Sequence, residues 1–338
     1  MKAVVLEGPG QAQLASIPEP RIVDEDEILL RISKIGLCGT DLNSYRGRNA
    51  LVSFPRVPGH EIAATVAELN PKYPEWQPGT AVTLSPYKSC GHCAACRRNR
   101  PNACKFNQTL GVQRDGALTE FLSVPAGKLF RANLSLKALC LVEPLTVGFH
   151  STARGRVSSG EVVAVFGCGG VGLGAVAAAA FKGATVIGVD LDDGKLATAR
   201  KAGATHTINS ANEDLHEILD QMTDGRGADV IIEAIGSRQT FRAAVDEVAQ
   251  TGRVVYLGFA KEDVAYDTRQ FVLKELDILG SRNALPEDFV AVIRMLEAGR
   301  FPVEDAVTHV IPMEETPRIL EAWNHEPTRF GKIMVDVS

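Results

Sequence analysis

The pattern of hydrophobic and polar residues changes character near the middle of the chain. Residues 1–150 contain short β-rich runs separated by turn residues, which predict an irregular, mainly-β domain. These runs are AVVLEG, EILLRISKIG, IAATVAEL, TAVTLSP and TEFLSVP. From Gly160 onward, continuously apolar runs alternate with helix-like segments such as SRQTFRAAVDEVAQ. Such runs are typical of strands buried on both faces of a parallel sheet, so a doubly wound α/β domain is expected there.

The parallel sheet should end before the C-terminal segment. Its predicted strands are EVVAVFG, ATVIGVD, ADVIIEAIG, GRVVYLG and LDILGSR. The following segment LPEDFVAVIRMLEAGR predicts an amphipathic helix, and KIMVDV near the end predicts a strand. These last elements do not continue the alternation cleanly, and we expect them to pack back on the first domain.

Composition narrows the class of protein. A chain of 338 residues with 45% hydrophobic and 23% charged residues predicts a globular protein of two domains. A net charge of -5 argues against nucleic acid as a partner. The most apolar stretch is interrupted by glycines, and the start lacks the apolar core of a signal peptide. We therefore expect no membrane association, a cytoplasmic location and a small-molecule substrate.

A glycine-rich turn lies between a predicted strand and a predicted helix. The sequence GCGGVG spans Gly167 to Gly172, directly after EVVAVF and before LGAVAAAAF. In a dinucleotide-binding turn, Gly167 would make the tight bend, Gly169 would admit the pyrophosphate and Gly172 would allow close helix packing. With Gly170 and Val171 these residues form the candidate pyrophosphate site at a helix N-terminus.

An acidic residue follows this turn at the spacing expected for a ribose ligand. Asp190 ends the run ATVIGVD, eighteen residues beyond Gly172. Its carboxylate can accept hydrogen bonds from ribose hydroxyls, and it would repel the 2′-phosphate of NADP. The next residues, LDD, offer no arginine for that phosphate. The sequence therefore predicts NAD as the cofactor, with Lys195 as a further cofactor-binding candidate.

Four of the seven cysteines are close together in the sequence, with the spacing C-x2-C-x2-C-x7-C. They are Cys90, Cys93, Cys96 and Cys104. Four thiolates in a short span can enclose one tetrahedral zinc ion, which makes such a site structural. Disulfides are an alternative, disfavoured by the cytoplasmic prediction. The interleaved arginines Arg97, Arg98 and Arg100 leave nucleic-acid binding as a weaker alternative, because the chain is acidic.

A second set of possible metal ligands is scattered along the chain. It comprises Cys38 in GLCGTD, His60 and Glu61 in PGHE, and Glu143 in LVEPLT. A catalytic zinc ion takes such thiolate, imidazole and carboxylate ligands and keeps one position open. Ligands so far apart in sequence can form a site only if the fold gathers them.

The motifs CGTD, GHE and EPLTVGFH together resemble the zinc-dependent medium-chain alcohol and polyol dehydrogenases. The resemblance spans essentially the whole chain and is nearest to the L-galactonate/L-gulonate 5-dehydrogenase and sorbitol/threonine dehydrogenase branches. It implies a GroES-like catalytic domain formed by residues 1–150 and 284–338, and a Rossmann domain formed by residues 151–283. It also implies one catalytic and one structural zinc ion per subunit, and a homodimer or homotetramer.

The resemblance also assigns roles in hydride transfer between a CH–OH group and NAD. It implies that Cys38 and His60 bind the catalytic zinc ion, and that Glu61 and Glu143 bind it or exchange with its water. It also implies that the Thr40 hydroxyl contacts the reacting oxygen and that Asp41 orients the histidine. Many relatives have a proton-relaying histidine where this chain has Asn43, which cannot titrate. Water and the ribose, or one of the two glutamates, would then carry the proton.

The substrate is predicted from segments that resemble the sugar-acid branch, GVQRDGALTEFLSVP and LGSRNALPEDF. A substrate carboxylate favours arginine, whose planar fork binds it with two hydrogen bonds. The candidates are Arg114 and Arg282, with Asn283 for a hydroxyl; Arg46 and Arg48 are weaker candidates. We expect oxidation of a secondary hydroxyl of L-galactonate or L-gulonate. Alternatives are a polyol, L-threonine or simple alcohol dehydrogenase and, as a minor one, a non-catalytic NAD-binding protein.

Overall fold

The structure is a computed structural model that describes residues 1–22, 24–327 and 329–337. It divides into two compact units. The first unit combines Met1–Glu143 with Val303–Ser338, and the second is Pro144–Pro302. The chain therefore leaves the first unit once, forms the second, and returns.

The first unit is mainly β. Its largest sheet has seven strands in the order β16-β17-β3-β4-β5-β9, with β8 paired to β3. These strands are β3 (Glu27–Leu37), β4 (Glu61–Val66), β5 (Ala81–Leu84), β8 (Phe121–Pro125), β9 (Leu129–Arg131), β16 (Val307–Pro312) and β17 (Lys332–Asp336). Two small sheets pair β1 (Lys2–Gly8) with β2 (Gln11–Ser16), and β6 (Tyr87–Lys88) with β7 (Gln108–Thr109). The short helices are α1 (Gly39–Tyr45), α2 (Ala94–Arg97), α3 (Leu136–Cys140), α11 (Val303–Ala306) and α12 (Thr316–His325).

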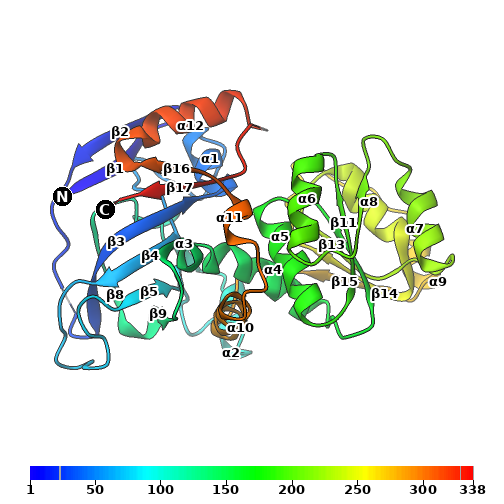
Figure 1. Cartoon of the computed structure of the whole chain (residues 1–338), viewed down its shortest axis with the longest axis horizontal. Helices are drawn as coiled ribbons and strands as arrows, with labels where there is room; N and C mark the ends of the chain where they lie inside the picture. The colour runs from blue at the N-terminus through cyan, green and yellow to red at the C-terminus, as the bar shows by residue number, and fades with distance from the viewer. Residues whose placement is uncertain (23, 328, 338) are drawn as a thin grey trace. The chain divides into compact units, whose positions relative to one another are not determined.

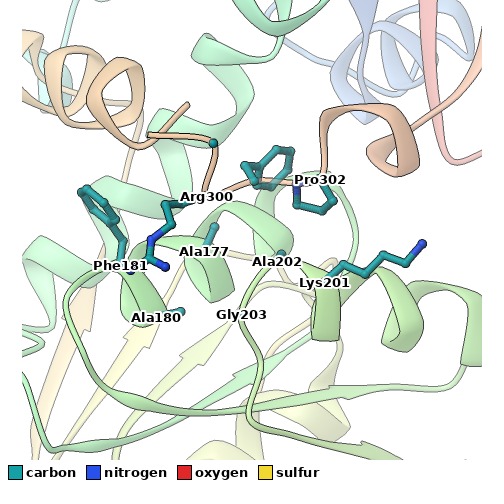
Figure 2. A pocket seen from close by; sticks show the side chains of 10 residues that line it. Ala177, Ala180, Phe181, Lys201, Ala202, Gly203, Arg300 and Pro302 are labelled. Atoms are coloured by element: carbon teal, nitrogen blue, oxygen red, sulfur yellow. The ribbon is translucent and has the colours of Figure 1, made fainter. Parts of the chain in front are cut away.

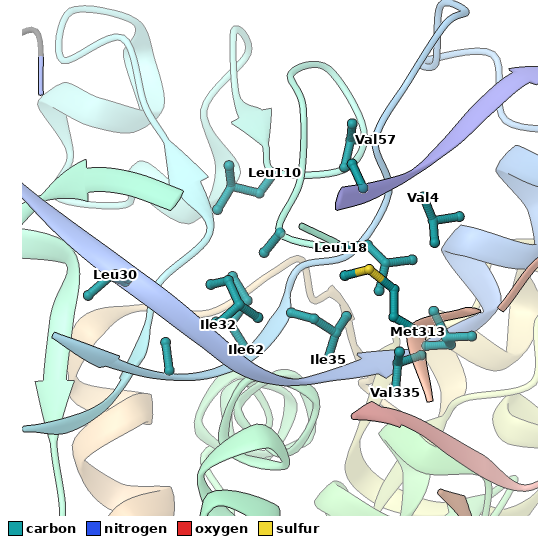
Figure 3. Close-up of a cluster of buried hydrophobic side chains, with 14 of the residues drawn as sticks. Val4, Leu30, Ile32, Ile35, Val57, Ile62, Leu110, Leu118, Met313 and Val335 are labelled. Carbon is teal, nitrogen blue, oxygen red and sulfur yellow. The ribbon is translucent and has the colours of Figure 1, made fainter. Parts of the chain in front are cut away.

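The C-terminal segment completes the core of this unit. Strand β17 pairs antiparallel with β3, with Val335 opposite Ile35, and Figure 1 shows the red end of the chain beside the blue strand. Met313 and Val335 belong to the same buried cluster as Val4 and Ile35, as Figure 3 shows. Apolar side chains from both ends of the sequence thus share one core. This was expected because the C-terminal elements do not continue the strand–helix alternation of the parallel sheet.

The second unit is a parallel α/β domain. Its six strands follow the order β12-β11-β10-β13-β14-β15, and every neighbouring pair is parallel. They are β10 (Val162–Phe166), β11 (Thr185–Asp190), β12 (His206–Asn209), β13 (Ala228–Glu233), β14 (Val248–Tyr256) and β15 (Asp277–Gly280). The helices are α5 (Gly170–Phe181), α6 (Asp193–Lys201), α7 (Leu215–Thr223), α8 (Arg238–Glu247), α9 (Arg269–Leu273) and α10 (Pro286–Glu297). This strand order is that of a Rossmann sheet, so the predicted fold class is confirmed.

The bounds of the compact units differ from the predicted domain limits at both ends. Residues 144–150 and 284–302 belong to the second unit. Helix α4 (Val142–Arg154) contributes His150, whose Nδ1 lies 2.9 Å from Asp288 Oδ2 on α10. Helix α10 also buries Phe289 and Met295. This buried polar contact and the apolar side chains of α10 attach the helix to the Rossmann unit, and only residues from Val303 onward return to the first.

None of the helices in the described part of the chain is both long and apolar enough to cross a bilayer.

Candidate functional site

The fold of the first unit brings Cys38 and His60 together. Cys38 follows the last residue of β3 and is the N-cap of α1, while His60 immediately precedes β4. Gly36 on β3 lies opposite Glu61 on β4. The antiparallel register therefore places Cys38, just after β3, and His60, just before β4, at the same end of the sheet. Cys38 Sγ lies 3.2 Å from His60 Nε2.

Asp41 holds the backbone of both segments. Its carboxylate accepts hydrogen bonds from the amides of Cys38, at 2.9 Å, and Gly59, at 3.2 Å. Its Oδ1 lies 3.9 Å from His60 Nδ1, which is too long for a hydrogen bond. Asp41 therefore contacts the backbone of Gly59, directly before the histidine, and places its carboxylate near the imidazole ring. The amide of Thr40 donates to Cys38 Sγ at 3.2 Å, so the cysteine side chain caps the first turn of α1.

The charges around His60 favour its protonated form when no metal is bound. Burial by itself lowers the pKa of His60, but the nearby charges of Cys38 and Asp41 outweigh it and hold the pKa well above its ordinary value. His60 Nδ1 is buried and has no hydrogen-bond partner among the described residues. A neutral imidazole is the form that binds metal, so a cation here would displace a proton.

Two buried carboxylates lie beside the histidine. One ligand atom from each of His60, Glu61 and Glu143 lies within 4.8 Å of the others. Lys332 donates to Glu61 Oε1 at 2.6 Å and to Oε2 at 2.5 Å. The hydroxyl of Tyr87 donates to Glu143, and burial raises the pKa of Glu143. Sequence reasoning missed Tyr87 and Lys332, because nothing in either local sequence indicates a contact with a distant glutamate.

These residues fit a catalytic zinc ion. His60 is shared by the group with Glu61 and Glu143 and by a second group containing Cys38 and Asp41, each with ligand atoms within 4.8 Å of one another. Thiolate, imidazole and carboxylate are the donor types of zinc sites that keep an open position. A zinc ion would also neutralise the negative charge of the Glu61 and Glu143 carboxylates, which are buried close to each other.

The four-cysteine cluster also fits zinc. The Sγ atom of Cys93 lies 3.6 Å from that of Cys96 and 3.8 Å from that of Cys104, and the Sγ atoms of Cys90 and Cys96 are 4.0 Å apart. Tetrahedral zinc with Zn–S bonds of about 2.3 Å requires sulfur separations of about 3.8 Å. Backbone amides lower the pKa of Cys93 to about 6, which favours its thiolate. All seven cysteines are free, and these separations are far longer than a disulfide bond.

In the second unit, the glycine-rich turn has the conformation that a dinucleotide site needs. Gly167 follows β10 with a φ of 93°, a left-handed value that favours glycine. A Cβ at Gly172 would lie 1.7 Å from the Gly167 carbonyl oxygen, whereas one at Gly169 would meet no atom within 4 Å. Gly169 is the N-cap of α5, and Gly170 and Val171 are its first two residues. The open space therefore adjoins the free amides of a helix N-terminus.

Asp190 lies beside this turn at the end of β11. Its Oδ2 accepts a hydrogen bond from the Cys168 amide at 2.8 Å, and its Oδ1 accepts from the amides of Leu191 and Asp192. The Lys195 ammonium lies 3.9 Å from Oδ1. Asp190 thus fixes the turn itself, in addition to the ribose contact predicted from its position.

Three exposed apolar side chains follow the carboxyl ends of strands in the parallel sheet. They are Leu191 after β11, Ile235 after β13 and Phe259 after β14. Ligands of open parallel sheets bind at this edge, so these residues join the candidates for cofactor contact. The sequence signal was available, because Leu191 and Phe259 directly follow predicted strands and Ile235 lies near the end of one.

The predicted substrate residues are divided between the two units. Arg114 lies in the first unit, where its Nη2 donates to the Pro86 carbonyl at 3.3 Å and burial lowers its pKa. Arg282 and Asn283 follow β15 in the second unit, and Asn283 has a left-handed φ of 51°. Arg46 donates to the side chain and the carbonyl of Asn324 on α12, which gives it a structural role.

A surface hollow of about 570 Å³ lies at the C-terminal ends of α5 and α6 (Figure 2). Its lining includes Phe181, Lys201 and Arg300. None of the predicted site residues lines it. Because α5 runs away from the glycine-rich turn, the hollow lies at the opposite end of that helix from the turn.

The chain matches two family models, for an alcohol dehydrogenase GroES-like domain over residues 24–133 and for a zinc-binding dehydrogenase over residues 170–298. It is 32% identical to sorbitol dehydrogenase of Bacillus subtilis, covering 99% of this chain and 97% of that one, and 32% identical to L-galactonate-5-dehydrogenase of Escherichia coli, covering 86% of each.

Solved structures agree with these matches. A putative zinc-binding dehydrogenase from Sinorhizobium meliloti bound to NADP is 27% identical, with a TM-score of 0.91 and 99% of each chain covered. An alcohol dehydrogenase from Escherichia coli complexed with NADH is also 27% identical, with a TM-score of 0.89, covering 100% of this chain and 99% of that one. The neighbours thus support zinc and a nicotinamide cofactor. The chain belongs to the zinc-type medium-chain alcohol dehydrogenases, oxidoreductases that act on CH–OH groups.

Proposed function

We propose that this protein oxidises a secondary hydroxyl of a polyhydroxylated substrate with NAD and a catalytic zinc ion, and that the substrate is a sugar acid such as L-galactonate or L-gulonate. The observation that carries the reaction type is the approach of Cys38 Sγ to His60 Nε2, at 3.2 Å, beside two buried carboxylates. The GroES-like unit supplies this ligand set, and the Rossmann unit supplies a glycine-rich turn suited to a dinucleotide.

The residues of the first unit would prepare the reacting groups. Cys38, His60 and a neighbouring glutamate would hold the zinc ion, which supplies Lewis-acid polarisation of the substrate oxygen when bound. Asp41 holds the backbone of both ligand segments through the amides of Cys38 and Gly59. Thr40, on the first turn of α1, carries the hydroxyl that would accept or donate a hydrogen bond at the reacting oxygen.

NAD is proposed over NADP because of Asp190. Its carboxylate lies at the carboxyl end of β11 next to the turn, where an adenosine ribose would bind. A 2′-phosphate would meet this negative charge, and Lys195 is already 3.9 Å from Asp190 Oδ1. Leu191 and Ile235 would provide exposed apolar surface for the cofactor.

A substrate anion is supported by Arg114. Its side chain is half-buried, and its buried Nε has no hydrogen-bond partner in the described ranges. Lys128 is a second half-buried cation; burial and the charge of Arg114 both lower its pKa. The Lys128 carbonyl accepts from Ser85 and the Arg114 guanidinium donates to Pro86. The next residue, Tyr87, contacts Glu143, so this pair of cations is anchored on the chain segment that leads to the metal ligands.

Assembly with a second copy is proposed through β15. This strand is at one edge of the Rossmann sheet, with Ile278 exposed and with Val272 and Leu273 exposed just before it. An edge strand beside apolar surface is suited to pairing across a two-fold axis. A homodimer or homotetramer would cover this surface.

The test is a substrate panel with the zinc-loaded protein. L-galactonate, L-gulonate, sorbitol, L-threonine and ethanol are compared by NADH formation, with NADP in place of NAD as the cofactor control. We expect the highest kcat/KM with an aldonate and NAD. Highest kcat/KM with sorbitol or threonine would contradict the sugar-acid proposal, and no NAD reduction with any substrate would contradict the proposed activity.

A further inference from the structure

The two carboxylates beside His60 accept hydrogen bonds from different side chains, Glu61 from Lys332 and Glu143 from Tyr87. Glu61 and Glu143 both have a ligand atom within 4.8 Å of His60, so distance alone does not select the one that binds the metal. Lys332 donates to both oxygens of Glu61, at 2.6 and 2.5 Å. Glu143 accepts a hydrogen bond on Oε1 from the neutral hydroxyl of Tyr87. The Lys332 ammonium therefore engages both oxygens of Glu61.

The strand order of the sheet in the first unit brings Lys332 close to Glu61. Strand β3 lies between β17, which carries Lys332, and β4, which carries Glu61. Gly36 on β3 is opposite Glu61, and a Cβ there would lie 2.0 Å from Glu61 Oε2. The missing side chain leaves the space that the carboxylate occupies. The Leu37 carbonyl, 3.3 Å from the ammonium, holds Lys332 at the same end of β3.

Burial makes this ion pair difficult to exchange. The side chains of Lys332 and Glu61 are only 10% and 2% exposed. If Glu61 turned to the metal, the ammonium would remain buried without its partner and close to a divalent cation. Both changes are unfavourable in a poorly solvated site, where charges are weakly screened.

We propose that Lys332 is a positioning residue that holds Glu61 away from the catalytic metal, so that Cys38, His60 and Glu143 form the resting ligand set. The inference rests on the metal site of the proposed function, and it selects between the two glutamates. Gly36 is also required for this arrangement, because any side chain at that position would displace the Glu61 carboxylate from Lys332.

The test compares metal binding in Glu61→Gln, Glu143→Gln, Lys332→Met and Lys332→Arg. Metal affinity is measured by competition with a chelator, and coordination by the absorption spectrum of the Co²⁺-substituted protein. Cys38→Ser gives the spectrum of the four-cysteine site for subtraction. Loss of a ligand or of its supporting partner typically weakens binding by about 10- to 100-fold.

We expect Glu143→Gln to weaken binding at least tenfold and to change the cobalt spectrum, and Glu61→Gln to leave the spectrum unchanged. Lys332→Met should change the spectrum because Glu61 becomes able to reach the ion. The double variant Lys332→Met/Glu61→Gln should restore the original spectrum, and Lys332→Arg should preserve it. A merely structural role of Lys332 would not produce restoration by a second substitution.

The inference is overturned if Glu61→Gln changes the spectrum while Glu143→Gln does not, or if folded Lys332→Met binds Co²⁺ with an unchanged spectrum. If Lys332→Met does not fold, the two glutamine variants still decide the ligand set. A protein with the expected spectra that reduces no NAD would refute the proposed activity and support the ligand assignment. A folded protein that binds metal only at the four cysteines would refute both.

Discussion

Cys38 Sγ and His60 Nε2 lie 3.2 Å apart, although the two residues are 22 positions apart in the sequence. The end of β3 and the start of β4 create this proximity, and Asp41 fixes the backbone on both sides. The pair has the spacing and donor types of two zinc ligands. The proposed metal-binding role of this pair therefore depends on the register of β3 and β4, and not on ligands that are close together in the sequence.

The first prediction concerns Cys38→Ser. A serine hydroxyl remains largely protonated and is a poor zinc ligand, so we expect loss of the catalytic ion and of at least about 99% of turnover. Zinc content should fall by one ion per chain, measured by metal analysis, while circular dichroism remains that of the folded protein. Retained turnover with one ion per chain would contradict the assignment.

The second prediction concerns Cys93→Ser in the four-cysteine cluster. Structural zinc contributes directly to folding energy, so this variant should lower the midpoint of thermal unfolding. The hydride step of the remaining folded protein should change little, because a zinc ion held by four thiolates would have no open position for substrate. The measurement is single-turnover NADH formation alongside thermal unfolding. If Cys93→Ser had a normal unfolding midpoint but no hydride transfer, the structural and catalytic assignments of the two metal sites would have to be reversed.

The third prediction concerns Asp190→Asn. The amide keeps one acceptor oxygen for the turn but removes the charge that should bind ribose hydroxyls and repel the 2′-phosphate. A hydrogen bond to a charged group contributes about 1.5–3 kcal/mol, so we expect the KM for NAD to rise about tenfold or more. The preference for NAD over NADP should narrow. An unchanged preference would show that other residues select the cofactor.

The fourth prediction concerns Arg114→Met, which keeps the apolar stem of the side chain and removes the guanidinium. We expect kcat/KM for an aldonate to fall about 10- to 100-fold, as the loss of a charge-assisted contact predicts. The value for an uncharged polyol should change little, and Arg21→Met provides a control at an exposed arginine outside the candidate site. Equal losses for both substrate types would contradict carboxylate recognition by Arg114.

The fifth prediction concerns the exposed edge strand. Ile278→Lys on β15 should reduce the mass of the assembly in light scattering, because a buried lysine at the pairing edge would be unfavourable. Val290→Lys on α10 is the matched control, since both side chains are 40% exposed. An unchanged assembly in Ile278→Lys, or dissociation only in Val290→Lys, would place the interface elsewhere.

The fold was predictable because its signals are local or periodic. The runs EVVAVFG and ATVIGVD became β10 and β11, and GCGGVG became the turn between β10 and α5. The boundary near residue 302 was not predictable, because the attachment of α10 depends on the buried contact of His150 with Asp288. No periodic pattern reports a contact between residues so far apart in the chain.

The candidate site shows the same division. Cys38, His60 and Glu143 were identifiable from their motifs and residue types, and the structure gathers them in one unit. Lys332 was not identifiable, because its contact with Glu61 crosses β3 and joins residues 271 positions apart. Lys128 was missed for a related reason: only burial beside Arg114 distinguishes it from an ordinary surface lysine.

The most direct test of the central claim is NADH formation from L-galactonate and L-gulonate, measured with the zinc-loaded protein and after selective removal of one zinc ion. We predict NAD-dependent oxidation of at least one aldonate that is lost on removal of the ion held by Cys38 and His60 and regained when zinc is restored. Full activity in protein that lacks this ion, or no oxidation of any hydroxyl substrate by protein holding both ions, would contradict it.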